Sequence, residues 1–110
     1  MREWGNAQKM DFMFDWVRNK YEYDYSQLES DGNYRMDADR SLGSDPIEVF
    51  RRGKGVCTGR SRLLKILLNN PYMNVQCYTV SGKYNDRLPH EWNEFVDENN
   101  QVWEYDLSFR

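Results

Sequence analysis

The stretch GKGVCTGRSRLLKILLNNP, residues 53–71, decides how this chain folds. Its second half is rich in leucine and isoleucine among basic residues, which is typical of a helix with most of its surface buried. Pro71 ends that helix, since proline cannot continue it and disfavours helical backbone at the residue before it. Gly53, Gly55 and Gly59 lie near the other end of that helix. We therefore expect a central, largely buried helix that begins at Cys57 and ends near Asn70.

Two further helices are predicted upstream. Apolar residues recur at helical spacing through the first, over residues 6–21; they are Met10, Met13, Phe14, Val17 and Tyr21. The second covers residues 44–53, where Pro46 stands at the first helical position and Gly53 follows the last turn. The polar, tyrosine-rich residues 22–43 lack a clear period, and we expect an irregular loop there.

Strand-like runs follow the central helix, at about residues 74–82, 90–96 and 100–107. Helices first and strands afterwards indicate an α+β domain in which helices pack on a small antiparallel sheet. At 110 residues the chain has the size of one compact domain, residues 1–110. Its apolar and aromatic contents, 39% and 15%, are sufficient to build one core.

Charge and composition narrow the functional classes. The formal net charge of -3 argues against a nucleic-acid partner, because nucleic-acid binders usually carry a basic excess. Six basic residues and no acidic one lie between Arg51 and Lys65, and we expect this cluster to assist the site around Cys57 or an acidic ligand. No run has the length of a signal peptide or a membrane span, which predicts no membrane partner. A cytoplasmic protein is expected unless the chain is cut from a longer precursor.

The two cysteines, Cys57 and Cys77, are too few for a disulfide framework, and with one histidine they cannot complete a four-ligand zinc site. We therefore expect no metal and no cofactor. Cys77 lies in the alternating run 75–80, which is typical of a buried strand. A thiol at a helix N-terminus differs, because unpaired amides and the helix dipole favour the thiolate there. Nearby Lys54 and Arg60 add positive charge, although a buried structural cysteine is the plain alternative.

A nucleophilic thiol needs a base, and the only histidine, His90, opens the predicted strand 90–96. A third group must accept from the other ring nitrogen, and Asp106 in the next strand is an acid that would be costly to bury without a partner. Each residue alone has a structural explanation. Together they suit one mechanism, with Cys57 as nucleophile, His90 as base and Asp106 as the group that orients the base.

Three segments resemble, in order, the motifs of the transglutaminase-like superfamily: GVCTGRS at residues 55–61, HEWN at residues 90–93 and WEYDLS at residues 103–108. The first predicted helix, the tyrosine-rich segment and residues 45–50 also resemble what stands before the cysteine motif in bacterial members, so the similarity covers roughly the whole chain. It implies a papain-like, transglutaminase-like core that uses the Cys, His and Asp of these motifs in this chain order.

The resemblance further implies cysteine-dependent attack on a peptide or carboxamide bond of a protein or peptide substrate, with protease or amidohydrolase activity as the first choice. Transamidation or deamidation of protein glutamine stays open. A non-catalytic protein-binding module on the same fold and acyl transfer of the arylamine acetyltransferase type are further alternatives. Glu91 departs from the family, which usually has a small residue there. The backbone amide of Cys57 is one expected oxyanion donor, with Trp4 and Tyr34 as candidates for the second.

The strand register follows from the need to bring His90 and Asp106 to one face of an antiparallel pair. One suitable register places Glu94 opposite Glu104, a like-charge pair that cross-strand energetics disfavour. We therefore predict the other, which pairs Trp92 with Glu104. The reverse face then holds large apolar side chains, and we expect the first helix or a partner to cover it.

Overall fold

The computed structural model describes residues 4–27, 41–84 and 88–107. Its helices are α1 (Asn6–Lys20), α2 (Ser41–Ser44), α3 (Pro46–Arg52) and α4 (Cys57–Asn69), with the 3-10 turn η1 (Tyr25–Gln27) after α1. The three predicted helices are confirmed close to their expected ends. The expectation of an irregular loop over residues 22–43 is wrong at both of its described ends, which hold β1, η1 and α2. No helix in the described ranges is both long and apolar enough to cross a membrane.

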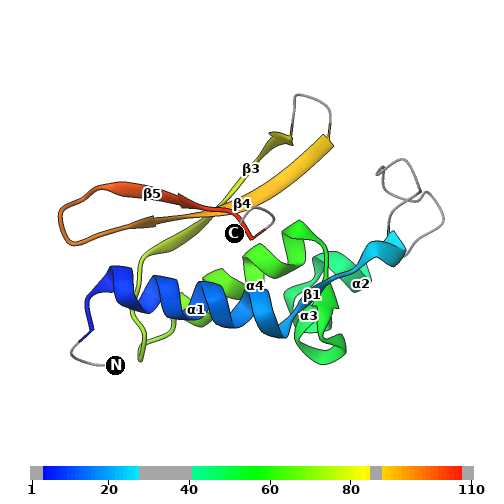
Figure 1. Ribbon diagram of the computed structural model, residues 1–110, viewed down its shortest axis with the longest axis horizontal. Coiled ribbons are helices and arrows are strands. Elements are labelled where there is room, and N and C mark those ends of the chain that lie inside the picture. The colour runs from blue at the N-terminus through cyan, green and yellow to red at the C-terminus, as the bar shows by residue number, and fades with distance from the viewer. Residues whose placement is uncertain (1–3, 28–40, 85–87, 108–110) are drawn as a thin grey trace.

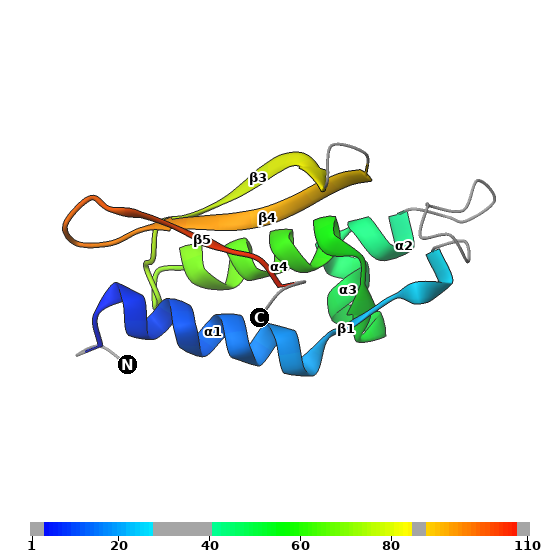
Figure 2. The same ribbon diagram turned by 45° about the horizontal axis from the view of Figure 1, so that its top comes forward.

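The strands form two sheets in the described part of the chain. β3 (Cys77–Tyr84), β4 (Leu88–Val96) and β5 (Val102–Tyr105) make an antiparallel sheet with β4 in the middle. β1 (Glu22–Tyr23) and β2 (Lys54–Gly55) make a short parallel pair. Figures 1 and 2 show α4 between the three-stranded antiparallel sheet and α1, with α3 beside the start of α4. The predicted α+β architecture is thereby confirmed.

Side chains and backbone conformation explain where α3 begins and where α3 and α4 end. Asp45 caps α3, because its Oδ1 accepts from the amide of Ile47 at 2.9 Å. Gly53 ends the same helix with a φ of 80°, in the left-handed region that glycine adopts without strain. Asn70 closes α4, since its Oδ1 accepts from the amides of Tyr72 and Met73 at 2.8 and 3.0 Å. These three helix ends therefore follow from residues that the sequence marks.

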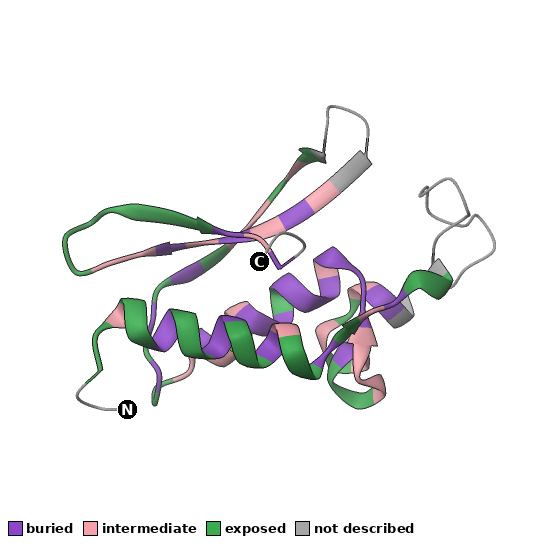
Figure 3. Cartoon of the chain, in the orientation of Figure 1, coloured by how far each residue is buried: buried purple, intermediate pink, exposed green. Residues whose placement is uncertain are grey.

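The core lies where α1, α4 and the antiparallel sheet meet. Leu64 and Leu68 of α4 are fully buried, and Figure 3 shows buried residues along most of this helix. Tyr105 packs edge-on against Phe14 of α1 and Phe95 of β4, with ring centroids 5.1 and 5.5 Å apart. Each such buried side chain stabilises the fold by about 1.5–3 kcal/mol. The expectation that the first helix covers this sheet face is met in part: α1 reaches Tyr105, but α4 lies between the sheet and most of α1 (Figure 2).

The register of β4 against β5 differs from the prediction. Glu94 lies directly opposite Glu104, in the pairing that we rejected for its like charges. Glu104 is exposed, so solvent screens the repulsion and its cost is small. Asp97 instead fixes the turn, because its Oδ1 accepts from the amides of Asn99 and Gln101 at 2.8 and 2.9 Å. Both registers leave the same residues on each face, so His90 and Asp106 still share one.

Candidate active site

Cys57 is the first residue of α4, where helical amides lack partners within the helix. Val56 precedes it in extended conformation, and its carbonyl accepts the first helical hydrogen bond, from the amide of Arg60 at 3.0 Å. The thiol is mostly shielded, since Cys57 is 6% exposed, and its Sγ lies 4.0 Å from Oγ1 of Thr58. The helix dipole at this position favours negative charge on the sulfur.

The start of α4 is held tightly against α2. The amide of Val56 donates to the carbonyl of Gly43 at 3.0 Å. A Cβ atom at Gly59 would collide with that same carbonyl and with the side chain of Val49. Glycine at position 59 therefore permits the close approach of two backbones, which fixes the segment that carries Cys57.

The short parallel pair β1–β2 braces the same segment from the other side. The amide of Asp24 donates to the carbonyl of Gly55 at 2.9 Å, and the Asp24 carboxylate lies 3.3 Å from Nη1 of Arg52. Burial acts to raise the pKa of Asp24, but hydrogen bonds from Ser26 and the charges of Lys54 and Arg52 outweigh it and hold that pKa below its usual value. Asp24 is therefore a buried, ionised anchor next to the nucleophile's loop.

His90 and Asp106 are in direct contact. Nε2 of His90 lies 2.7 Å from Oδ2 of Asp106, and the two side chains are 12% and 20% exposed. The His90 ring also stacks on Trp92, with centroids 5.9 Å apart. Because an ionised carboxylate only accepts, this contact assigns the proton to Nε2 and leaves Nδ1 of the neutral ring as an acceptor. Such a ring can take up a proton at Nδ1 while the carboxylate stabilises the resulting imidazolium.

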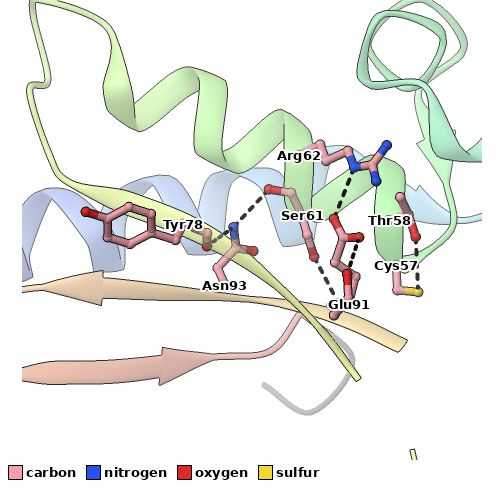
Figure 4. A network of polar contacts seen from close by, with 8 residues as sticks. Cys57, Thr58, Ser61, Arg62, Tyr78, Glu91 and Asn93 are labelled. Atoms are coloured by element: carbon pink, nitrogen blue, oxygen red, sulfur yellow. Dashed lines mark hydrogen bonds and ion pairs between the residues drawn. The ribbon is translucent and has the colours of Figure 1, made fainter. Parts of the chain in front are cut away.

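Polar contacts join the helix that carries Cys57 to the strand that carries His90 (Figure 4). Oγ of Ser61 donates to the carbonyl of Glu91 at 3.2 Å, and Nδ2 of Asn93 donates to the carbonyl of Ser61 at 2.9 Å. Nε of Arg62 lies 3.2 Å from the Glu91 carboxylate. The sequence indicated Glu91 only as a departure from the family. It indicated no role for Ser61 or Asn93, although both stand in the family-like segments 55–61 and 90–93.

Arg60 is a buried cation of α4, three residues after Cys57. Its guanidinium is buried in α4 one turn after Cys57, and it interacts electrostatically with both Cys57 and Asp106. The predicted nucleophile and the predicted orienting acid both act electrostatically on this one cation.

Trp4 and Tyr34 were the candidates for the second oxyanion donor. Trp4 packs on Phe12 at the start of α1, with ring centroids 5.6 Å apart. The other end of α1 leads into β1 beside the Cys57 loop, and a helix of 15 residues is about 22 Å long. The proposal of Trp4 is therefore wrong, and Tyr34 lies outside the described residues. In the described ranges no three His, Cys, Asp or Glu side chains cluster as metal ligands would.

Two solved structures of other proteins have a fold similar to that of this chain. A crystal structure of a TGase superposes with a TM-score of 0.78 at 23% identity, covering 99% of this chain and 28% of that one. A proposed cysteine protease from Cytophaga hutchinsonii gives a TM-score of 0.63 at 16% identity, covering 91% of this chain and 30% of that one. This chain thus spans less than a third of either protein, and these likenesses show the fold.

No curated protein sequence matches the chain. The family model of the transglutaminase-like superfamily, in contrast, matches residues 3–107, which include all of the described elements from α1 to β5. The chain belongs to the transglutaminase-like superfamily.

Proposed function

We propose that the chain carries out cysteine-dependent acyl chemistry on peptide or carboxamide bonds, with hydrolysis as the outcome. Cys57 is the nucleophile, His90 the base and Asp106 the residue that orients His90. The observation that carries the proposal is the 2.7 Å contact between His90 and Asp106, together with the position of Cys57 as the first residue of α4. A protein or peptide is the proposed substrate.

The reaction begins when the proton of the Cys57 thiol passes to His90. The thiolate attacks the carbonyl carbon, and the negative charge on the oxygen is stabilised by the backbone amide of Cys57. The C–N bond then breaks, the departing amine or ammonia takes the proton from His90, and a thioester remains on the sulfur. His90 next takes a proton from water, which attacks the thioester and releases a carboxylic acid, and the thiol is restored.

The acceptor of the acyl group decides between two activities of the same site. Water makes a peptidase or amidohydrolase, whereas a primary amine makes a transglutaminase. Hydrolysis is the proposal. A non-catalytic binding module is the alternative from another class, and the presence of all three triad residue types argues against it.

The test assays one preparation in three ways: cleavage of a peptide library, ammonia release from glutamine peptides, and incorporation of a biotinylated primary amine. Cys57→Ala should abolish the activity, while Cys77→Ala is the matched control because Cys77 lies buried in β3. Activity that survives Cys57→Ala would exclude the mechanism. Absence of all three activities, with a folded protein, would favour the binding module, and amine incorporation above hydrolysis would reassign the outcome.

A further inference from the structure

Arg60 is a charged side chain that the proposed reaction leaves without a role. It is only 5% exposed, and its Nε has no hydrogen-bond partner among the described residues. Burying a guanidinium is costly unless nearby negative charge compensates it. The groups around Arg60 therefore indicate what this cation is for.

Position 60 is three residues after Cys57 in α4, so the two side chains lie on the same side of the first helical turn. Burial lowers the pKa of Arg60, while the negative forms of Tyr23, Tyr25, Cys57 and Asp106 act to raise it. These groups come from β1, η1, α4 and the segment after β5. An arginine stays cationic at neutral pH under such a shift. The negative forms of both acidic members of the proposed triad therefore interact with one permanent positive charge.

The neighbouring cations act on other groups. Arg52 and Lys54 both stabilise the ionised form of Asp24, and Arg52 pairs with it at 3.3 Å. Arg62 pairs with Glu91 at 3.2 Å. Lys54 and Arg60 were both candidates to favour the Cys57 thiolate. Because Lys54 acts on Asp24, Arg60 is the candidate that remains.

We propose that Arg60 is a positioning residue that balances the charge of the Cys57 thiolate and the Asp106 carboxylate within the buried site, a role that rests on the proposed function. When the thiol proton moves from Sγ to the ring of His90, the thiolate, imidazolium and carboxylate together carry one net negative charge. The net charge is the same before the transfer, so Arg60 acts through its position on the same helical turn as Cys57, where it stabilises the charge that forms on the sulfur. Without this cation the protonated thiol gains relative stability, and Cys57 ionises at higher pH.

The test measures the rate at which iodoacetamide alkylates Cys57, from about pH 5 to about pH 9, with peptide mapping to separate Cys57 from Cys77. The variants are Arg60→Met, Arg60→Lys and the control Arg51→Met, whose arginine is exposed and pairs with Glu48 on α3. In Arg60→Met the midpoint of the profile should rise by about one pH unit or more, which slows alkylation about tenfold below the midpoint. Arg60→Lys should restore most of the shift, and Arg51→Met should match the wild type.

An unchanged profile in folded Arg60→Met overturns the proposal. Removing one charge from a buried, compensated set costs stability, so thermal unfolding followed by circular dichroism first checks that the variant is folded. If it does not fold, Arg60→Gln removes the same charge and is read in the same way; unfolding of both variants assigns Arg60 to stability alone and also overturns the proposal. Alkylation needs no substrate, so a wild type without amide-bond activity removes the proposed function while this profile still decides the role of Arg60.

Discussion

His90 and Asp106 meet diagonally across β4 and β5, not as direct cross-strand partners. The ladder pairs Asn93 with Tyr105, and its continuation puts Asp106 beside Trp92, yet Oδ2 of Asp106 reaches Nε2 of His90 at 2.7 Å. Diagonal neighbours on one face of a sheet lie within reach of longer side chains. The two side chains would also share a face in the predicted register, two residues away, whereas a shift by one residue would move Asp106 to the other face.

The first prediction concerns the charge of Asp106. Asp106→Asn keeps the shape of the side chain but removes the charge that stabilises the His90 imidazolium, so kcat/KM should fall by about 10²- to 10⁴-fold, mostly in kcat. Steady-state kinetics on the best substrate of the library would measure it. Asp15→Asn is the control, because Asp15 is exposed on α1 and pairs with Arg18 of the same helix. Wild-type kcat in the Asp106 variant would remove Asp106 from the mechanism.

The second prediction contrasts the two cysteines. Burial raises the pKa of Cys77 from 9.0 to about 11, partly offset by a hydrogen bond from Asn93. Native Cys77 should therefore resist iodoacetamide at neutral pH, while Cys57 reacts and urea exposes both. Mass spectrometry of digested protein separates the two sites. Equal rates at both cysteines in the native protein would contradict the different environments that the fold gives them.

The third prediction follows from the same raised pKa. Between about pH 9 and about pH 11 the unfolded chain releases the Cys77 proton while the folded chain keeps it, so stability falls as pH rises through this window. The contribution lost is at most roughly 3 kcal/mol. Urea unfolding should show a shallower decline in Cys77→Ala than in the wild type, and parallel declines in the two proteins would refute the assignment.

The sequence predicted the helices and the fold class because their signals are local. Apolar periodicity marks α1 and α4, and Pro46 and Gly53 mark the ends of α3. The brace between β1 and β2 went undetected, since strands of two residues have no alternation. The register failed for a different reason: the like-charge argument assumed an unscreened pair, whereas the turn at Asp97 decides the pairing. The polar contacts between α4 and β4 join residues about thirty positions apart, which spacing alone does not reveal.

The fourth prediction tests the brace beside the Cys57 loop through Asp24. Its pKa lies below the usual value of 3.8, so its contribution to stability is present above that pH and is lost as pH falls through the lower folded value. Asp24→Asn should lower the free energy of unfolding at neutral pH by about 1–3 kcal/mol and make it less sensitive to acid in that range. Urea titrations at neutral and acid pH measure both effects. A variant with wild-type stability and acid sensitivity would show that Asp24 is not an anchor.

The last prediction concerns Asn93, which lies fully buried in β4 and donates from Nδ2 to the carbonyl of Ser61 at 2.9 Å. Asn93→Ala leaves that carbonyl of α4 without this donor and should cost about 1–3 kcal/mol of stability. Because the contact fixes β4 along the helix that begins at Cys57, His90 should lose its placement, and kcat should fall about tenfold or more while KM changes little. Kinetics well below the melting temperature separate this loss from unfolding, and Asn99→Ala, at an exposed turn, is the matched control. A variant that is less stable but keeps the wild-type kcat would show that Asn93 acts in packing alone. In protein that remains folded, we expect turnover to fall because β4, which carries His90, moves relative to α4.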